Sequence, residues 1–101
     1  MVRHTRDRAD KRISRGEVWL AALDPTVGSE IQKTRPCLVL SPPEINDRLR
    51  IVIAAPMTTS SSPAPTRIRV DFQARTGLVL LEQIRELDKN RLVRRLGSLN
   101  A

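Results

Sequence analysis

Short apolar runs, most of them separated by loops that contain proline or glycine, constrain the fold of this 101-residue chain more than any other feature of its sequence. No segment keeps a helical period of apolar residues over three turns, and the sequence contains no internal repeat. Runs of this length between proline- and glycine-containing loops are typical of strands in a small barrel. The sequence therefore predicts a small β-barrel or sheet-rich roll, with strands over residues 16–23, 37–41, 50–57, 66–72 and 77–81.

The last quarter of the chain is harder to divide. The apolar run from Gly77 continues through Glu82 and Gln83 into residues 84–88, and residues 91–96 fit either a short strand or a helical turn. A polar pair within an apolar run is also what a kink or bulge in a sheet produces. Two interpretations of Glu82 and Gln83 therefore stay open, a structural bend and a functional group at a strand end.

The length fits one domain with a modest core, and the formal charge of +7 favours an anionic partner such as nucleic acid or an acidic protein. Residues 1–15 alone hold six basic and two acidic side chains. We expect residues 1–14 to form a basic, disordered tail, or alternatively a phosphate-binding arm, and residues 15–101 to form the folded domain.

Several classes of site are excluded by composition. The only aromatic residues are Trp19 and Phe72, too few for the stacking platforms of common RNA-binding modules. His4 is the only histidine and Cys37 the only cysteine, which leaves no Cys/His zinc site, no histidine pair and no Ser-His-Asp triad. We expect Cys37 to be a core residue, and we expect no metal, no cofactor, no membrane segment and a cytoplasmic protein.

Polar residues at the ends of the predicted strands are what remain for chemistry. Arg35 precedes the second strand, Thr58 to Ser60 follow the third, and Glu82–Gln83 interrupt the later run. Strand ends in a small barrel can converge on one rim, so we expect these three groups to line one concave surface. Taken singly, each also fits a structural role: an exposed ion pair, a polar loop or a bulge.

Three blocks of the sequence resemble the MazF/PemK (Kid) toxins of bacterial toxin–antitoxin systems. "RGEVWLAALDPTVGSEIQKTRPCLVLSP" is similar to the family's opening, "IVIAAPMTTS" to its second block and "LVLLEQIRELDKNRL" to its third. The resemblance covers about residues 15–99, with the blocks in the family's order, and the chain is closest to the MazF pattern. Some PemK-type members carry an Arg and an Asp in the third block, where Leu80 and Glu82 stand here.

The resemblance implies a mainly β fold with short helices, a small SH3-like β-barrel of the MazF/PemK/CcdB type. It implies a homodimer that acts as a sequence-specific, metal-independent endoribonuclease (an mRNA interferase) on single-stranded RNA, neutralised by an acidic MazE-like antitoxin. By the same resemblance Arg35 and Thr58 are the catalytic pair, with Thr59 as the substitute if the match slips by one residue. Further catalytic or RNA-binding candidates are Ser29, Glu30, Lys33, Thr34, Glu82 and Gln83.

The chemistry of RNA cleavage agrees with these residue types. Attack by the RNA's own 2′-OH yields 2′,3′-cyclic phosphate and 5′-OH ends and requires neither a metal nor an enzyme nucleophile. A guanidinium suits stabilisation of the dianionic phosphorane, and a threonine hydroxyl can orient the phosphate or the 2′-OH. Two rivals remain: a CcdB-like toxin that binds DNA gyrase without cleaving RNA, and a non-catalytic nucleic-acid-binding barrel.

Overall fold

The computed structural model describes residues 12–23 and 34–99, and these form a mainly β structure with one short α-helix and two 3₁₀ turns. This confirms the predicted fold class. The elements are β1 (Glu17–Ala22), β2 (Thr34–Val39), α2 (Pro43–Asn46), β3 (Ile51–Thr58), β4 (Arg67–Phe72), β5 (Arg75–Leu80), η1 (Leu81–Gln83), β6 (Arg85–Asp88), η2 (Lys89–Arg91) and β7 (Leu92–Ser98).

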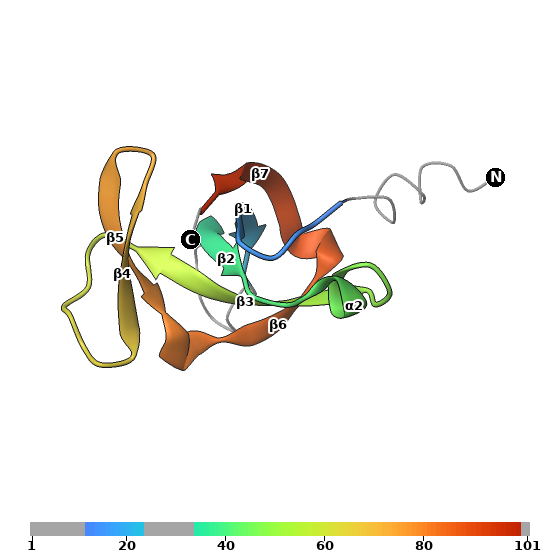
Figure 1. The fold of residues 1–101 in the computed structure, drawn as a ribbon, viewed down its shortest axis with the longest axis horizontal. Coiled ribbons are helices and arrows are strands. Elements are labelled where there is room, and N and C mark those ends of the chain that lie inside the picture. The colour runs from blue at the N-terminus through green and yellow to red at the C-terminus, as the bar shows by residue number, and fades with distance from the viewer. Residues whose placement is uncertain (1–11, 24–33, 100–101) are drawn as a thin grey trace, which may run out of the picture.

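The strands form an antiparallel sheet in the order β4-β5-β3-β2-β1-β7, and β6 pairs with β3. β3 lies at the centre of this arrangement. It pairs with β2 along one edge, and along the other edge with β6 at its start and with β5 at its end. Figure 1 shows β3 running through the molecule towards the β4–β5 hairpin, which projects to the left of the curled sheet.

Two apolar clusters form the core, one on each side of the central strand. The first gathers Trp19, Cys37, Val52 and their neighbours, and the second gathers Val18, Ala55, Met57 and Val79. Because side chains alternate along a strand, β3 contributes to both clusters. β3 is therefore fixed from both faces, and this fixes the backbone that leads into Thr58.

Ile13 belongs to the first of these clusters and is only 3% exposed. The sequence placed this residue in the N-terminal segment 1–14, yet it packs with Trp19 and Val39. The backbone N–H of Ser14 also donates to Glu17 Oε1 at 2.9 Å. The folded core thus takes in at least one residue of that segment, while residues 1–11 lie outside the described part of the chain.

A buried polar network explains α2, which the sequence patterns did not predict. Asn46 is 1% exposed, and its Nδ2 donates to the carbonyl of Ser41 at 2.8 Å. The Ser41 hydroxyl also donates to Asn46 Oδ1 and accepts the Ile53 backbone N–H. A four-residue helix is too short to show an apolar period, and Pro43 opens it at a position where its missing N–H carries no penalty.

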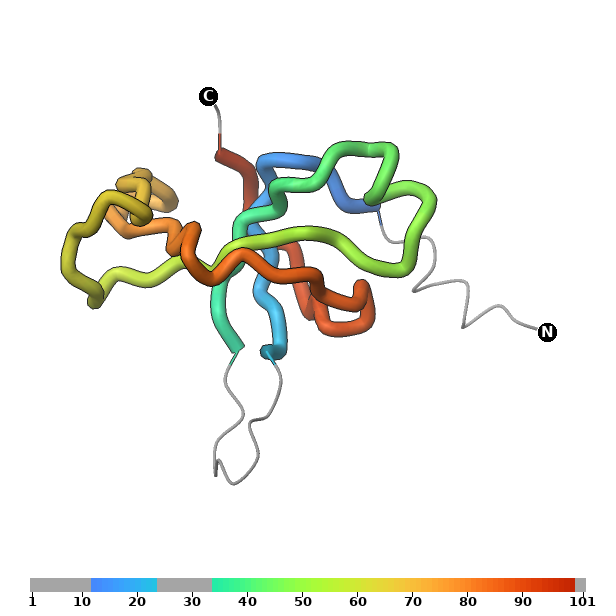
Figure 2. Tube along the Cα trace, turned by 90° about the horizontal axis from the view of Figure 1, so that it is seen from below, coloured from blue at the N-terminus to red at the C-terminus, as the bar shows by residue number. Residues whose placement is uncertain are grey.

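Three strand boundaries differ from the predicted ones by two residues or more. β2 begins at Thr34 rather than at residue 37 and ends at Val39, and β5 begins at Arg75 rather than at residue 77. In both cases the polar start of the strand extends past the core, so no apolar residue marks it. Figure 2 shows the outer ends of β1 and β2, paired at Ala22 and Thr34, projecting together from the body.

The long apolar run after Gly77 is two strands, not one. η1 breaks it at Leu81–Gln83, so β5 pairs with β4 and β3, whereas β6 pairs with β3 alone. Residues 91–96, which fitted either structure, end η2 and begin β7. The bend at Glu82 and Gln83 lets two successive strands share one edge of β3.

Candidate active site

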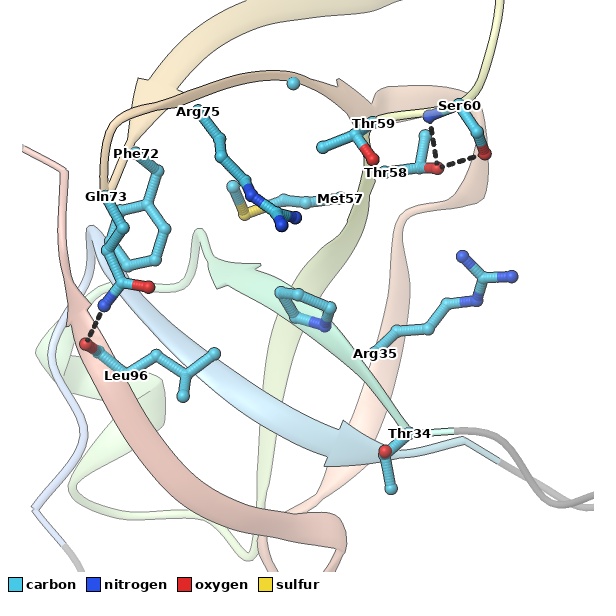
Figure 3. A pocket seen from close by; sticks show the side chains of 12 residues that line it. Thr34, Arg35, Met57, Thr58, Thr59, Ser60, Phe72, Gln73, Arg75 and Leu96 are labelled. Carbon is cyan, nitrogen blue, oxygen red and sulfur yellow. Dashed lines mark hydrogen bonds between the residues drawn. The ribbon is translucent and has the colours of Figure 1, made fainter.

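A cavity of about 650 Å³ opens where β2 and β3 separate. β2 pairs with β3 only as far as Cys37 and Pro56, after which β3 pairs with β5 instead. Arg35 and Thr58 each lie two residues beyond that last pair, so continued pairing in the same register would have placed them opposite each other. The separating strands therefore leave these two residues on either side of an opening (Figure 3).

Four segments line the cavity. β2 supplies one wall, the end of β3 and the residues after it a second, the β4–β5 hairpin a third, and β7 a single leucine. The lining residues are Thr34, Arg35, Pro36, Met57, Thr58, Thr59, Ser60, Phe72, Gln73, Arg75, Gly77 and Leu96.

The Thr58 hydroxyl is held in place by the residue two positions later. Its Oγ1 accepts the Ser60 backbone N–H at 3.2 Å and lies 3.2 Å from Ser60 Oγ (Figure 3). Since the N–H occupies one lone pair of Oγ1, the hydroxyl keeps its own proton to donate, either to Ser60 or to a ligand. The arrangement suits a group that donates a hydrogen bond to an anion.

The charge of the cavity lining is positive. Among the described residues the lining carries the guanidinium groups of Arg35 and Arg75 and no carboxylate. Within the described residues neither guanidinium has a hydrogen-bond or ion-pair partner. Two unpaired cations facing a cavity favour an anionic ligand, and a planar guanidinium matches a phosphate in two-point contact.

Cys37 lies next to the cavity but does not take part in it. Its side chain is 1% exposed, which confirms the predicted core position. Burial raises the pKa of the Cys37 thiol to about 11, and the nearby charges of Arg85 and Arg35 only partly offset this. The thiol is thus neutral at ordinary pH and is no nucleophile.

The cavity brings together Thr34, Arg35, Thr58 and Thr59, four of the residues named from the sequence. Glu82 and Gln83 lie outside the lining, so the expectation that all three polar groups line one surface is wrong for the third group. The remaining candidates, Ser29, Glu30 and Lys33, lie outside the described residues.

Glu82 instead ties η1 to β4. Its carboxylate accepts from Thr66 Oγ1 at 2.8 Å and from Arg67 Nε and Nη2 at 3.0 Å each. Its own backbone N–H, the Thr66 hydroxyl and Arg67 hold the pKa of Glu82 below its usual value. The carboxylate is therefore bound by Thr66 and Arg67 at the base of the hairpin. This favours the interpretation of Glu82 and Gln83 as a structural bend.

No pattern in the sequence indicated that Arg75, Gln73 or Phe72 would line a cavity. They come from the β4–β5 hairpin, whose two-residue turn Gln73–Ala74 contains none of the glycine, asparagine or aspartate residues that usually mark such a turn. The strict alternation over residues 66–72 could have suggested a hairpin partner, because a half-exposed strand needs a neighbour. It could not have indicated where that hairpin points.

The described segments 12–23 and 34–99 contain no group of three or more His, Cys, Asp or Glu side chains placed to hold a metal ion. Nor does any helix in these segments have the length and apolar character needed to cross a membrane.

Comparison with known sequences gives the family. Residues 14–101 match the profile of the PemK-like, MazF-like toxins of type II toxin–antitoxin systems. The endoribonuclease EndoA of Bacillus subtilis is 36% identical over 95 residues, which cover 87% of this chain and 81% of EndoA. The endoribonuclease PemK of Escherichia coli is 36% identical over 86 residues, 80% of this chain, and the chain spans 65% of the length of PemK.

Solved structures share the fold. MazF in a MazE–MazF complex from Deinococcus radiodurans superposes with a TM-score of 0.77 at 27% identity, covering 90% of this chain and 84% of that one. A mycobacterial endoribonuclease in complex with its cognate antitoxin gives a TM-score of 0.70 at 26% identity, covering 87% and 80%. These matches confirm the predicted MazF-type barrel. The chain belongs to the PemK-like, MazF-like toxins of type II toxin–antitoxin systems.

Proposed function

We propose that this chain is the toxin of a toxin–antitoxin system and cuts single-stranded RNA in the cavity between β2 and β3, with Arg35 and Thr58 as the catalytic residues. The observation that carries this is their placement on either side of the opening. Each lies two residues along its strand from the last β2–β3 pair. Endoribonuclease relatives at 36% identity support the activity.

In the proposed reaction the RNA 2′-oxygen attacks the adjacent phosphorus, and the bond from phosphorus to the 5′-oxygen breaks. The 2′-OH proton leaves to a base and the departing 5′-oxygen gains a proton, giving 2′,3′-cyclic phosphate and 5′-OH ends. Arg35 stabilises the negative charge that builds on the phosphorane, and Thr58 donates a hydrogen bond that fixes the phosphate for in-line attack. The described lining residues include no carboxylate or histidine to serve as that base. Glu30, a catalytic or RNA-binding candidate from the sequence, lies outside the described residues.

We also propose that an acidic antitoxin neutralises the protein by covering the cavity. The MazE–MazF and endoribonuclease–antitoxin complexes among the structural neighbours support an antitoxin partner, and the two unpaired guanidiniums support its acidic character. A homodimer, on the resemblance to the family, and a cytoplasmic location, on the single cysteine of the sequence, complete the proposal.

The test is to incubate the purified protein with long, unstructured RNAs in the presence of EDTA and to sequence the new 5′-OH ends. The parent should produce cyclic-phosphate-ended fragments at a short recurring motif. Arg35→Ala should slow cleavage roughly 10²–10³-fold, as loss of a charge-stabilising donor does. Thr58→Ala should slow it by about 10²-fold through lost positioning.

The matched control is Arg69→Ala, which removes the same charge from an exposed position on β4 outside this cavity. Its cleavage rate should stay near that of the parent. Cleavage by Arg35→Ala at the parent rate would contradict the assignment of that residue. Inhibition of DNA gyrase without any RNA fragment, or RNA binding without cleavage, would replace the proposal with one of the two rival functions.

A further inference from the structure

A second guanidinium enters the same cavity from the side opposite β2. Arg75 is the first residue of β5, and its side chain is directed into the cavity in Figure 3. Arg75 is exposed and has no hydrogen bond or ion pair among the described residues. Nothing in the fold of the described chain requires a cation there, because the charge balances no carboxylate of the lining.

The backbone beside Arg75 is held in an unusual conformation. Gln73 and Ala74 form the turn between the paired residues Phe72 and Arg75, and both have positive φ, 53° and 65°. Residues with a Cβ rarely adopt such values, and each does so at some expense in free energy. The turn is therefore made of two residues other than glycine. It is followed directly by Arg75, whose side chain lines the cavity.

One hydrogen bond and one close contact anchor this turn to the far wall. Gln73 Nε2 donates to the carbonyl of Leu96 on β7 at 2.9 Å. Phe72 lies against Gly97, where a Cβ would come within 3.0 Å of the ring. The hairpin is therefore seated on β7, so Arg75 has a defined position across the cavity from Arg35.

The cavity lining also has an apolar part, beside its threonine, serine and glutamine side chains. Met57, Phe72, Pro36 and Leu96 contribute to it, and Met57 is 7% exposed. The volume of about 650 Å³ lies within the range of about 300–1,000 Å³ that small-ligand sites occupy. A flat, largely apolar group flanked by two negative charges fits this lining, and a base between two backbone phosphates has that form.

We propose that Arg75 binds a second backbone phosphate of the RNA, next to the one held by Arg35, and that the base between them rests on the apolar lining. The inference builds on the proposed function, because it takes the cavity to be the RNA site. Arg75 is a binding residue in this scheme: it touches the substrate at a phosphate whose bonds do not change. An acidic protein segment could meet the same two cations, and the test separates it from RNA.

The experiment measures binding apart from cleavage. The probe is a fluorescein-labelled, mixed-sequence 2′-O-methyl RNA octamer, which lacks the nucleophilic 2′-OH and so stays intact. Its affinity is measured by anisotropy at a series of salt concentrations, since each phosphate contact to a single strand contributes about 0.7 to the slope of log affinity against log salt. The variants are Arg75→Ala, Arg75→Gln and the matched control Arg69→Ala.

We expect Arg75→Ala and Arg75→Gln each to weaken binding about tenfold near 0.1 M salt and to reduce the slope by about 0.7. Arg69→Ala removes an equal charge from the same hairpin and should leave the slope unchanged. Two substitutions at Arg75 guard against a misfolded variant, and thermal unfolding checks that each variant is folded.

A slope that falls equally for Arg69→Ala and the Arg75 variants would overturn the inference, since it would reflect net charge alone. So would an unchanged slope at Arg75, or a parent that does not bind the probe. If the parent binds with an Arg75-dependent slope yet cuts no RNA, the proposed nuclease fails while the phosphate site stands. If the parent cuts RNA and only binding of an acidic antitoxin peptide depends on Arg75, the second cation serves the protein partner and the RNA inference falls.

Discussion

A Cβ added at Gly77 would lie 3.0 Å from the carbonyl oxygen of Thr58 and 3.6 Å from Thr59 Cγ2. β5 approaches the end of β3 this closely because residue 77 has no side chain. The nearest neighbour is backbone, so it cannot rotate out of the way as a flexible side chain would. Gly77 thereby sets the position of Thr58.

Gly77→Ala should displace the end of β3 and slow RNA cleavage, because Thr58 would shift by a few tenths of an ångström. We expect a loss of activity of about tenfold, well below the roughly 10²-fold that a displacement of a full ångström can produce. The free energy of unfolding should fall by about 1–3 kcal/mol, as in other overpacked sites. Cleavage rate and urea unfolding are the two measurements.

The control for that variant is Gly16→Ala. Gly16 has a φ of +91°, and among the described residues a Cβ there would meet only the Leu99 carbonyl at 3.5 Å. The substitution strains the backbone away from the cavity and should lower stability by about 1 kcal/mol with no change in cleavage. Equal loss of activity in both variants would show that general destabilisation, not the position of Thr58, is responsible.

Ala74→Gly should stabilise the protein. Ala74 has a φ of +65°, which glycine adopts without the clash of a Cβ, so the substitution should raise the free energy of unfolding by about 1 kcal/mol. Ala64, in the loop before β4, does not have a positive φ, so Ala64→Gly removes no backbone strain and should be neutral or slightly destabilising. Chemical denaturation distinguishes them, and a less stable Ala74→Gly variant would contradict the strain at this turn.

Glu17 should make the free energy of unfolding depend on pH in the acid range. Burial raises the pKa of Glu17, but hydrogen bonds from Trp19 Nε1, the Ser14 N–H and Arg95 outweigh it and leave the pKa below its ordinary value of 4.5. A lowered folded pKa gives stability that is present above 4.5 and is lost as pH falls through the folded value. Glu17→Gln should therefore cost about 1 kcal/mol at pH 7 and progressively less in acid.

The comparison for Glu17→Gln is Glu86→Gln. Glu86 is exposed on β6, and its side chain has no hydrogen bond or ion pair within the described residues. Its substitution should leave the pH dependence of urea unfolding as in the parent. The same acid dependence in the parent and in Glu17→Gln would assign the effect to other carboxylates.

Cys37 should be unreactive in the native protein. With a thiol pKa of about 11 and 1% exposure, it should not react with a disulfide reagent at pH 8 until urea unfolds the chain. The raised pKa also gives a stability contribution that is full below 9.0 and is lost as pH rises through about 11. Rapid reaction of the folded protein would place the thiol at the surface instead.

Local patterns in the sequence were enough to predict the strands whose apolar residues enter the core. They were not enough to predict the polar ends of strands that extend past the core. β3 was predicted almost to the residue because its apolar run ends where the strand ends. The polar start of β2 was missed, since Thr34 and Arg35 leave the core and follow no alternation. The placement of Arg35 and Thr58 on either side of the opening follows from strand register, which single strands do not encode.

Arg75 shows the same limit more sharply. In the sequence it is one arginine among 18 basic residues, with no motif around it. Its place in the cavity depends on a turn without glycine and on the contact of Gln73 with β7. Arg35 and Thr58 lie within the family-like blocks of the sequence and could be predicted from them. Arg75 lies outside those blocks, and tertiary contacts were needed to place it at the cavity.

The two sides of the cavity are held in place by different contacts, so the sequence of one side can change without moving the other. Thr58 ends a strand held by both core clusters, so changes there propagate through the whole fold. Arg75 follows a two-residue turn that rests on β7 through one side-chain hydrogen bond and the contact of Phe72 with Gly97. Hairpins of other lengths and sequences could replace the segment between β4 and β5 while Arg35 and Thr58 keep their positions, so the proposed RNA contacts on this side of the cavity are free to change.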